Sequence, residues 1–142
     1  MKKLQLIVAS ILILFITACT SSYGKKIKIN DTLEIYAKGD SVTDADAKKL
    51  GEYLANLWKD SKNQKSLQLL KTNGVYEVKM VIDVTKLKAD SSLEFGFMVI
   101  QSMLEHDVFP GSKVKFTITD DVFKPIKSFQ GDSGDTSSSS KS

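Results

Sequence analysis

The chain has 142 residues, a formal net charge of +3, one Cys and one His, and all 20 of its basic residues are Lys. This length suits a single domain, because hydrophobic cores usually come in units of ~100–150 residues. A near-neutral chain without Arg is a poor candidate for nucleic-acid binding, and one Cys and one His exclude a disulfide framework, multi-Cys zinc sites and multi-His metal centres.

The first 18 residues have the parts of a bacterial signal peptide. Lys2 and Lys3 give a positive start, an almost unbroken apolar run of 13 residues follows, and two small side chains precede Cys19. This run is too short for a membrane-spanning helix, which needs ~20 apolar residues, but it fits the ~7–15-residue apolar core of a signal peptide. Removal of residues 1–18 would leave 18 Lys against 17 acidic residues, a net charge of +1.

The residues Ile16-Thr17-Ala18-Cys19 resemble the lipobox of bacterial lipoproteins. In that family the signal is cut just before Cys, whose sulfur receives a diacylglycerol and whose new amino end is usually acylated too, and two or three fatty chains give stable anchoring. The resemblance implies lipidation of Cys19 and attachment to an envelope membrane, the outer one in a Gram-negative source because Thr20 is not Asp. The alternatives are a secretory signal followed by a free thiol, which exported proteins rarely keep, or an uncleaved anchor.

Polar segments flank the rest of the chain. Residues 19–24 would form the lipidated Cys and a short tether, and residues 130–142 form a Ser-rich tail whose last 12 residues include no apolar side chain. A segment that buries nothing cannot offset the entropy of ordering, so we expect this tail to be disordered. The folded α+β domain is therefore expected at residues 25–129.

The first part of the domain predicts a hairpin followed by a helix. Apolar and polar residues alternate over 26–29 and 32–38, which is typical of two strands. Thr43 is placed as an N-cap with Asp46 at the third helical position, so a helix is expected over residues 44–59. Its core stripe consists of apolar residues at helical spacing: Ala47, Leu50, Leu54, Leu57 and Trp58.

The middle of the domain predicts a second hairpin and a second helix. Residues 67–70 and 75–84 have strand patterns, and Asn73-Gly74 between them is the strongest short hairpin signal. Ser91-Ser92-Leu93-Glu94 is a capping box that opens a helix ending near His106. The apolar stripe of this helix is Leu93, Phe97, Ile100, Met103 and Leu104.

A third hairpin is expected at the end of the domain. Residues 113–118 alternate, Asp120-Asp121 can turn, and a last strand over 123–129 contains Pro125, which favours an edge position. The order hairpin, helix, hairpin, helix, hairpin predicts an α+β two-layer sandwich. We expect a mainly antiparallel sheet with one wet face and two helices on the other.

Three segments together resemble a module of uncharacterised exported bacterial proteins. They are the capped helix with Leu50-Gly51-Glu52-Tyr53-Leu54, then Val75-Tyr76-Glu77-Val78, and then Val108-Phe109-Pro110-Gly111 before the strand at 114–121. These are packing and turn residues, so the resemblance implies a shared fold over most of the domain and no particular activity.

Gly39-Asp40-Ser41-Val42-Thr43 lies between a predicted strand and a predicted helix and resembles the first block of GDSL hydrolases, in which Ser is the nucleophile. A nucleophilic Ser needs a base and oxyanion donors. The single His, His106, is not preceded by Asp at the family's spacing, and a domain of about 105 residues is small for that doubly wound fold. The alternative interpretation, a turn followed by a helix cap, explains the same residues.

His106 is the second candidate catalytic residue. It lies between Glu105 and Asp107, so it could be a general base tuned by carboxylates. A lone His at the negative end of a helix is more often a charge-complementary terminus. The structural interpretation is favoured because no partner for His106 is visible in the sequence.

Other polar and aromatic residues also have structural explanations. No metal or cofactor is expected, because the acidic residues lack EF-hand spacing and suit caps and turns: Asp40, Asp44, Asp46 and the pair Asp120-Asp121. Three lysines near the expected anchor could contact anionic headgroups or simply form a solvated strand face: Lys25, Lys26 and Lys28. Three aromatic residues are candidates for a ligand surface, the last of them also on a core stripe: Tyr36, Tyr53 and Trp58.

The sequence therefore favours a lipid-anchored, non-enzymatic module of the bacterial cell envelope that binds another envelope protein or a ligand. The alternative is a small GDSL-like envelope hydrolase that uses Ser41, with His106 as its base. A small-ligand carrier with a pocket between sheet and helices is a third hypothesis, which the sequence neither supports nor excludes.

Overall fold

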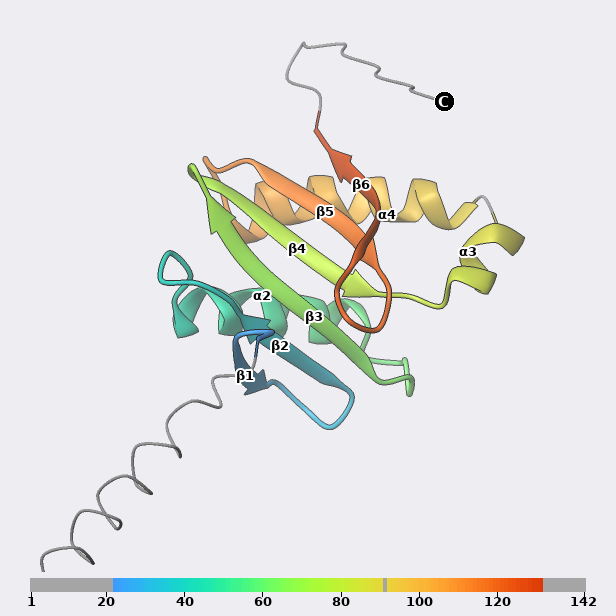
Figure 1. The fold of residues 1–142 in the computed structure, drawn as a ribbon, viewed down its shortest axis with the longest axis horizontal. Helices are drawn as coiled ribbons and strands as arrows, with labels where there is room; N and C mark the ends of the chain where they lie inside the picture. Colours follow the sequence, from blue (N-terminus) through green and yellow to red (C-terminus); the bar gives the residue numbers. More distant parts are fainter. Residues whose placement is uncertain (1–21, 91, 132–142) are drawn as a thin grey trace, which may run out of the picture.

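The computed structural model describes residues 22–90 and 92–131, which form a six-stranded sheet with helices packed on one face (Figure 1). The signal-peptide and lipidation predictions, and the tail from residue 132 onward, lie outside the described residues. The elements in chain order are β1 (Lys25–Lys28), β2 (Leu33–Ala37), α2 (Asp44–Leu57), β3 (Lys65–Thr72), β4 (Val75–Val81), α3 (Val84–Ala89), α4 (Ser92–Met103), the π-helical turn η2 (Leu104–Val108), β5 (Val114–Thr119) and β6 (Pro125–Gln130).

The sheet is mixed, so the prediction of a mainly antiparallel sheet is wrong. The strands lie side by side in sequence order, and the three hairpins β1–β2, β3–β4 and β5–β6 are antiparallel as predicted. The neighbours β2 and β3, and also β4 and β5, are parallel. Each of these pairs is joined by a helical crossover, and a helix returns the chain to the end of the sheet from which the strand began, so the next strand runs parallel.

The first crossover follows the prediction closely. Thr43 caps α2: its side chain accepts from the Asp46 backbone N–H (3.1 Å), and the Asp46 carboxylate accepts from the Thr43 backbone N–H (3.0 Å). This capping box satisfies two backbone donors that a helix start leaves unpaired. The helix ends at Leu57, and Trp58 is its C-cap, whereas the sequence predicted an end at Lys59.

The second crossover contains a helix that the sequence analysis missed. The structure ends β4 at Val81, and residues 84–89, of which Val84 was expected to end the strand, form the short helix α3. Asp83 caps it by accepting from the Thr85 backbone N–H (2.9 Å). The β-branched pair Val84-Thr85 extended the strand pattern, and the cap residue just before it was the signal that ended the strand. The domain therefore has three α-helices instead of two.

The predicted helix from the capping box at Ser91 is α4, which continues into η2 as far as Val108. Ser91 lies outside the described residues, so the capping box is untested, while the Ser92 backbone N–H donates to Asp90 (2.9 Å). In the π-helical turn the Phe109 N–H donates to the Leu104 carbonyl, five residues back (2.9 Å). Such turns are often found at functional positions in helices.

The core lies between the sheet and the helices, with α2 over the β1–β2 side and α4 over β5 and β6. Burial alternates as predicted along β2 and β4, whereas Gln68 in β3 and Thr117 and Thr119 in β5 are buried on the face that was expected to be wet. The fully buried apolar side chains of the strands include Ile35, Leu67, Leu69, Val78, Phe116 and Ile118. α4 contributes Phe97, which stacks on Phe116 with ring centroids 5.7 Å apart. α2 approaches the sheet closely at Gly51, where a Cβ atom would meet Ile29 Cδ1 at 2.3 Å. β6, which contains Pro125, is an edge strand as predicted.

Among the described residues, no helix combines the length and the apolar character that a membrane span requires.

Candidate functional site

The structure places Ser41 in the exposed loop between β2 and α2. Gly39 in this loop has φ +88°, and Thr43 caps the helix, so the segment forms the turn and cap that the sequence offered as the alternative to a nucleophile elbow. Among the described residues, no hydrogen bond joins Ser41 to His106. The arrangement does not provide Ser41 with the adjacent base that a serine nucleophile needs.

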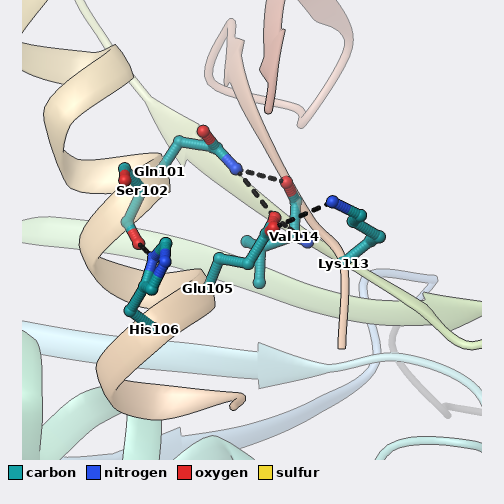
Figure 2. Close-up of polar contacts among 6 residues, drawn as sticks. All are labelled: Gln101, Ser102, Glu105, His106, Lys113 and Val114. Carbon is teal, nitrogen blue, oxygen red and sulfur yellow. Dashed lines mark hydrogen bonds and ion pairs between the residues drawn. The ribbon is translucent and has the colours of Figure 1, made fainter. Parts of the chain in front are cut away.

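His106 is exposed and lies in the π-helical turn η2. Its ring Nδ1 donates to the carbonyl oxygen of Ser102 at 2.8 Å (Figure 2). The two neighbouring carboxylates, which were expected to tune His106, bond elsewhere: Asp107 accepts from the Tyr53 hydroxyl (2.7 Å) and Glu105 from the Val114 backbone. The His106 ring therefore pairs a backbone carbonyl near the end of the helix, and no carboxylate within residues 22–90 and 92–131 orients it as a general base.

Glu105 is the centre of a polar cluster that ties η2 to the start of β5 (Figure 2). Its Oε2 accepts from the Val114 backbone N–H (3.0 Å) and from Gln101 Nε2 (3.1 Å), and its Oε1 pairs with Lys113 Nζ (3.2 Å). Gln101 is 5% exposed, and its amide also donates to the Val114 carbonyl (2.9 Å). Together the two side chains satisfy both backbone groups of Val114, as a neighbouring strand would. We call this group the Val114 clasp: Gln101, Glu105, Lys113 and Val114.

The electrostatics of the clasp favour the ionised carboxylate. The Val114 N–H, followed by Lys113 and more weakly the charge of His106, holds the pKa of Glu105 below its ordinary value, and partial burial works in the opposite direction. Sequence reasoning missed the clasp. The available signal was Gln101, a polar residue on the buried side of the helix, four residues after Phe97 and three before Leu104.

A cleft of about 320 Å³ lies beside the clasp. Its walls come from the end of the helix and the turn before β5, in which Gly111 has φ +81°. It offers both a carboxylate and an ammonium group, but these are paired with each other, so the cleft has no unneutralised charge to bind an ion. The lining residues are Glu105, His106, Pro110, Gly111, Ser112 and Lys113.

A second cavity, of about 270 Å³, lies on the face of the sheet that the helices leave open. Three aromatic rings meet there: Tyr23 before β1, Tyr36 on β2 and Phe123 in the β5–β6 loop, with centroids 5.6–6.3 Å apart in edge-to-face arrangements. We call this group the aromatic triad. Of the predicted ligand-surface residues, only Tyr36 lines this cavity. Trp58 packs against the core, and Tyr53 bonds Asp107.

Most of the remaining polar candidates have structural partners, whereas the exposed side chains of Asp40 and Asp121 form no hydrogen bond or ion pair with the described residues. Asp44 pairs with Lys25, Asp46 caps α2, and Asp120 organises the β5–β6 loop by accepting from two backbone N–H groups. The other two lysines near the expected anchor pair with acidic residues on the same hairpin, Lys26 with Glu34 and Lys28 with Asp31. In the part of the chain that the structure describes, no three His, Cys, Asp or Glu side chains are grouped so that they could hold a metal ion.

Comparison with known proteins adds one finding. No curated protein and no solved structure matches the chain. Residues 26–130, which include all six strands except the first residue of β1, match the model of a protein family whose description is that of a family N-terminal domain. The description names a position in a chain and no activity. The chain therefore belongs to this N-terminal domain family, an uncharacterised family with an α+β fold.

Proposed function

We propose that the chain is a lipid-anchored protein of the bacterial cell envelope, held to a membrane through Cys19, and that its domain is a binding module for another envelope protein or a ligand. The observation that carries the anchoring is the sequence Ile16-Thr17-Ala18-Cys19 at the end of a signal-like apolar run. Fatty chains on this Cys would give the two or more membrane signals that stable attachment needs.

The start of the domain supports a short tether. Tyr23 packs against the other two rings of the aromatic triad, and its carbonyl accepts from Nε2 of Gln68 (2.7 Å), a residue that is 1% exposed. Four residues from Cys19 to Tyr23 span at most ~14 Å. A lipidated Cys19 would therefore keep the sheet close to the membrane surface, instead of on a long flexible arm.

Binding is favoured over catalysis because His106 and Glu105 already form structural hydrogen bonds. The carboxylate of Glu105 and the Nδ1 of His106 are engaged in bonds that hold the helix end and β5. The cavity on the open face is lined instead by rings and uncharged polar groups beside Asp121, a composition typical of ligand sites. This supports a role in which the domain captures a partner and the anchor localises it.

The test of anchoring is intact-mass measurement of the protein isolated from bacterial membranes. We expect a chain that begins at Cys19 and carries a diacylglycerol and an additional acyl group. A Cys19→Ala variant should keep residues 1–18 and lack the lipid mass. An unmodified thiol in the native chain, or a native mass that includes residues 1–18, would contradict the proposal.

The hydrolase alternative is tested on the same preparation with short-chain acyl esters. We expect no ester cleavage that depends on Ser41. Hydrolysis that disappears in Ser41→Ala while the variant keeps its folded circular dichroism spectrum would replace the binding proposal with the enzymatic one.

A further inference from the structure

The aromatic triad is built at a conformational cost. Phe123 has φ +60°, a backbone region that bulky side chains rarely adopt, and its ring is nevertheless 7% exposed and in contact with both tyrosines. Such conformations persist where the surroundings determine them and are concentrated at ligand clamps and active sites.

Asp120 determines the conformation of the loop that carries Phe123. One carboxylate oxygen accepts from the backbone N–H groups of Val122 (3.0 Å) and Lys124 (2.8 Å). The Asp120 carbonyl accepts from the Phe123 N–H (3.2 Å), and its own N–H donates to the Lys124 carbonyl (3.1 Å). Four bonds through one residue fix the loop, so Phe123 is held over the open face of the sheet against Tyr36, a residue of β2, three strands away from β5.

The cavity beside these rings combines apolar walls with uncharged polar groups. Ser66 and Gln64 lie at the start of β3, and the exposed carboxylate of Asp121 lies at the loop. The nearby ammonium group of Lys26 is 2.6 Å from the Glu34 carboxylate, so its charge is matched. Because the remaining charge at the rim is the carboxylate of Asp121, an anionic ligand is disfavoured.

We propose that this cavity binds a neutral sugar, a single pyranose ring placed against the partly exposed rings of Tyr23 and Tyr36, which the buried Phe123 supports. A ring face has negative potential and attracts the weakly positive C–H groups of a sugar, while hydroxyls can donate to Asp121 and exchange hydrogen bonds with Gln64. Sugar hydroxyls can also donate to Ser66 Oγ, whose own hydrogen is donated to Glu34 (2.9 Å). The volume of about 270 Å³ is just under the ~300–1,000 Å³ of sites for drug-sized ligands, which suits a ligand of one ring.

The proposal deepens the proposed function and rests on it only for the source of the sugar. Tyr23 contributes one wall of the cavity, and it lies at most ~14 Å of chain from Cys19. In an anchored protein the cavity would therefore be within reach of a glycolipid headgroup in the same membrane as well as of a soluble glycan.

The test uses the full chain purified in detergent. Ligand-observed saturation-transfer NMR with glucose, N-acetylglucosamine and their β-linked oligomers measures binding of free sugars. The same measurement with glucosylglycerol, the free headgroup of a glucosyl diacylglycerol, tests a glycolipid source without interference from the membrane anchor. We expect saturation transfer from at least one sugar, and from glucosylglycerol if the source is a glycolipid.

Two variants locate the site, and one serves as a control. Asp121→Ala and Tyr36→Ala should each weaken sugar binding about tenfold or more, because each removes a polar or stacking contact. Lys113→Ala, in the cleft beside the Val114 clasp, should bind as the native chain does. If Tyr36→Ala does not fold, as judged by thermal unfolding, the exposed Asp121 position and an Asp121→Asn variant carry the test.

The outcomes separate the two proposals. A Cys19→Ala chain that binds sugar in solution supports the cavity whatever happens to the anchor, and a lipidated chain that binds no sugar leaves only the anchor. The sugar proposal is overturned if the native chain gives no saturation transfer from any of these sugars at millimolar concentration, or if the Asp121 and Tyr36 variants bind as well as the native chain.

Discussion

The two helical crossovers have the same topology but hold their helices in different ways. In the first, α2 buries one stripe against the sheet and begins at a capping box, and Leu57 is its one large apolar side chain classed as exposed. In the second, α4 is apolar on both sides: Phe97 is buried, while Phe95 is 70%, Met98 54% and Val99 41% exposed. An amphipathic helix has one face that prefers the core, whereas an apolar helix has several.

In the second crossover, hydrogen bonds define the orientation of α4, which its hydrophobic pattern leaves undefined. Gln101 and Glu105 lie on the side of the helix that meets β5, and the Val114 clasp holds them there. If α4 rotated about its axis, these bonds would break and leave buried polar groups unpaired, which costs more than the bonds themselves contribute. We infer that the contrast between its apolar and polar faces sets the rotation of α2, whereas hydrogen bonds set the rotation of α4. The following substitutions test this difference.

The largest effect is expected in the core beneath α2. Leu54 is fully buried, so Leu54→Ala should lower the free energy of unfolding by about 2–5 kcal/mol through lost burial and a residual cavity. Leu57→Ala, on the same helix but 40% exposed, is the matched control and should cost clearly less. Urea denaturation monitored by circular dichroism measures both. Equal losses of unfolding free energy in the two variants would show that the apolar stripe of α2 does not determine which face of the helix is buried.

The next effect belongs to the Val114 clasp. Glu105→Ala removes the acceptor for the Val114 N–H, Gln101 and Lys113, and should cost about 1–3 kcal/mol. The control is Glu94→Ala, which removes a solvent-exposed ion pair with Lys127 and should cost ~1 kcal/mol or less. If the two substitutions have the same effect in urea denaturation, the clasp does not hold α4.

The pH dependence of stability sharpens the same point. Because the pKa of Glu105 is lowered in the folded protein, chiefly by the Val114 N–H, the carboxylate contributes stability above the unfolded pKa of ~4.3. That contribution is lost as the pH falls through the lowered folded pKa. Glu105→Gln should therefore unfold at lower urea concentration at pH 7 and lose less further stability on acidification than the native chain. Parallel stability curves for the two chains between pH 7 and pH 3 would contradict this.

A smaller effect is expected at the cap of α2. Thr43→Ala removes the acceptor for the Asp46 N–H and should cost about 1 kcal/mol. Ser41→Ala, two residues earlier in the exposed loop, should change stability by no more than about 0.5 kcal/mol. A comparison of thermal unfolding midpoints separates the cap from its neighbour, and a null effect at Thr43 would mean that packing alone defines the start of the helix.

The smallest effect is expected on the outer side of α4. Met98→Gln removes an apolar side chain that is 54% exposed and should change the free energy of unfolding by about 0.5 kcal/mol or less. A loss as large as that of Leu54→Ala would show that this side is covered in solution. Sedimentation of the native chain at increasing concentration would then identify self-association as the cause.

Local signals made the first half of the domain predictable. The capping residues Thr43 and Asp46 and the Asn73-Gly74 turn, with φ values of +51° and +78°, appear in the structure as the sequence indicated. Each is a contact between residues a few positions apart, so a short stretch of sequence contains all the groups that form it. The short helix α3 was missed because its β-branched residues continue a strand pattern, and its cap at Asp83 is the only local sign against it.

The candidate sites were less predictable because their parts lie on different elements of the fold. The aromatic triad joins positions 23, 36 and 123, and the Val114 clasp joins a helix to a strand through Gln101 and Glu105. The sequence named Tyr36 and His106 as candidates, but no periodicity indicates that Phe123 would reach Tyr36. Ser41 and His106 were paired in the hydrolase hypothesis because of their residue types. Residue type does not indicate how far apart two side chains lie in the folded protein.

By itself, the sequence determined the three hairpins, the positions of α2 and α4 and the α+β class, while the membrane-anchoring signal at Cys19 stays a prediction. These follow from periodicity and nearest-neighbour chemistry, which act over a few residues. Tertiary structure alone decided that two strand pairs run parallel, how α4 is rotated, and that three rings meet on the open face. Those outcomes depend on contacts between separate elements of the fold, and such contacts contribute energy only after the chain has brought the elements together.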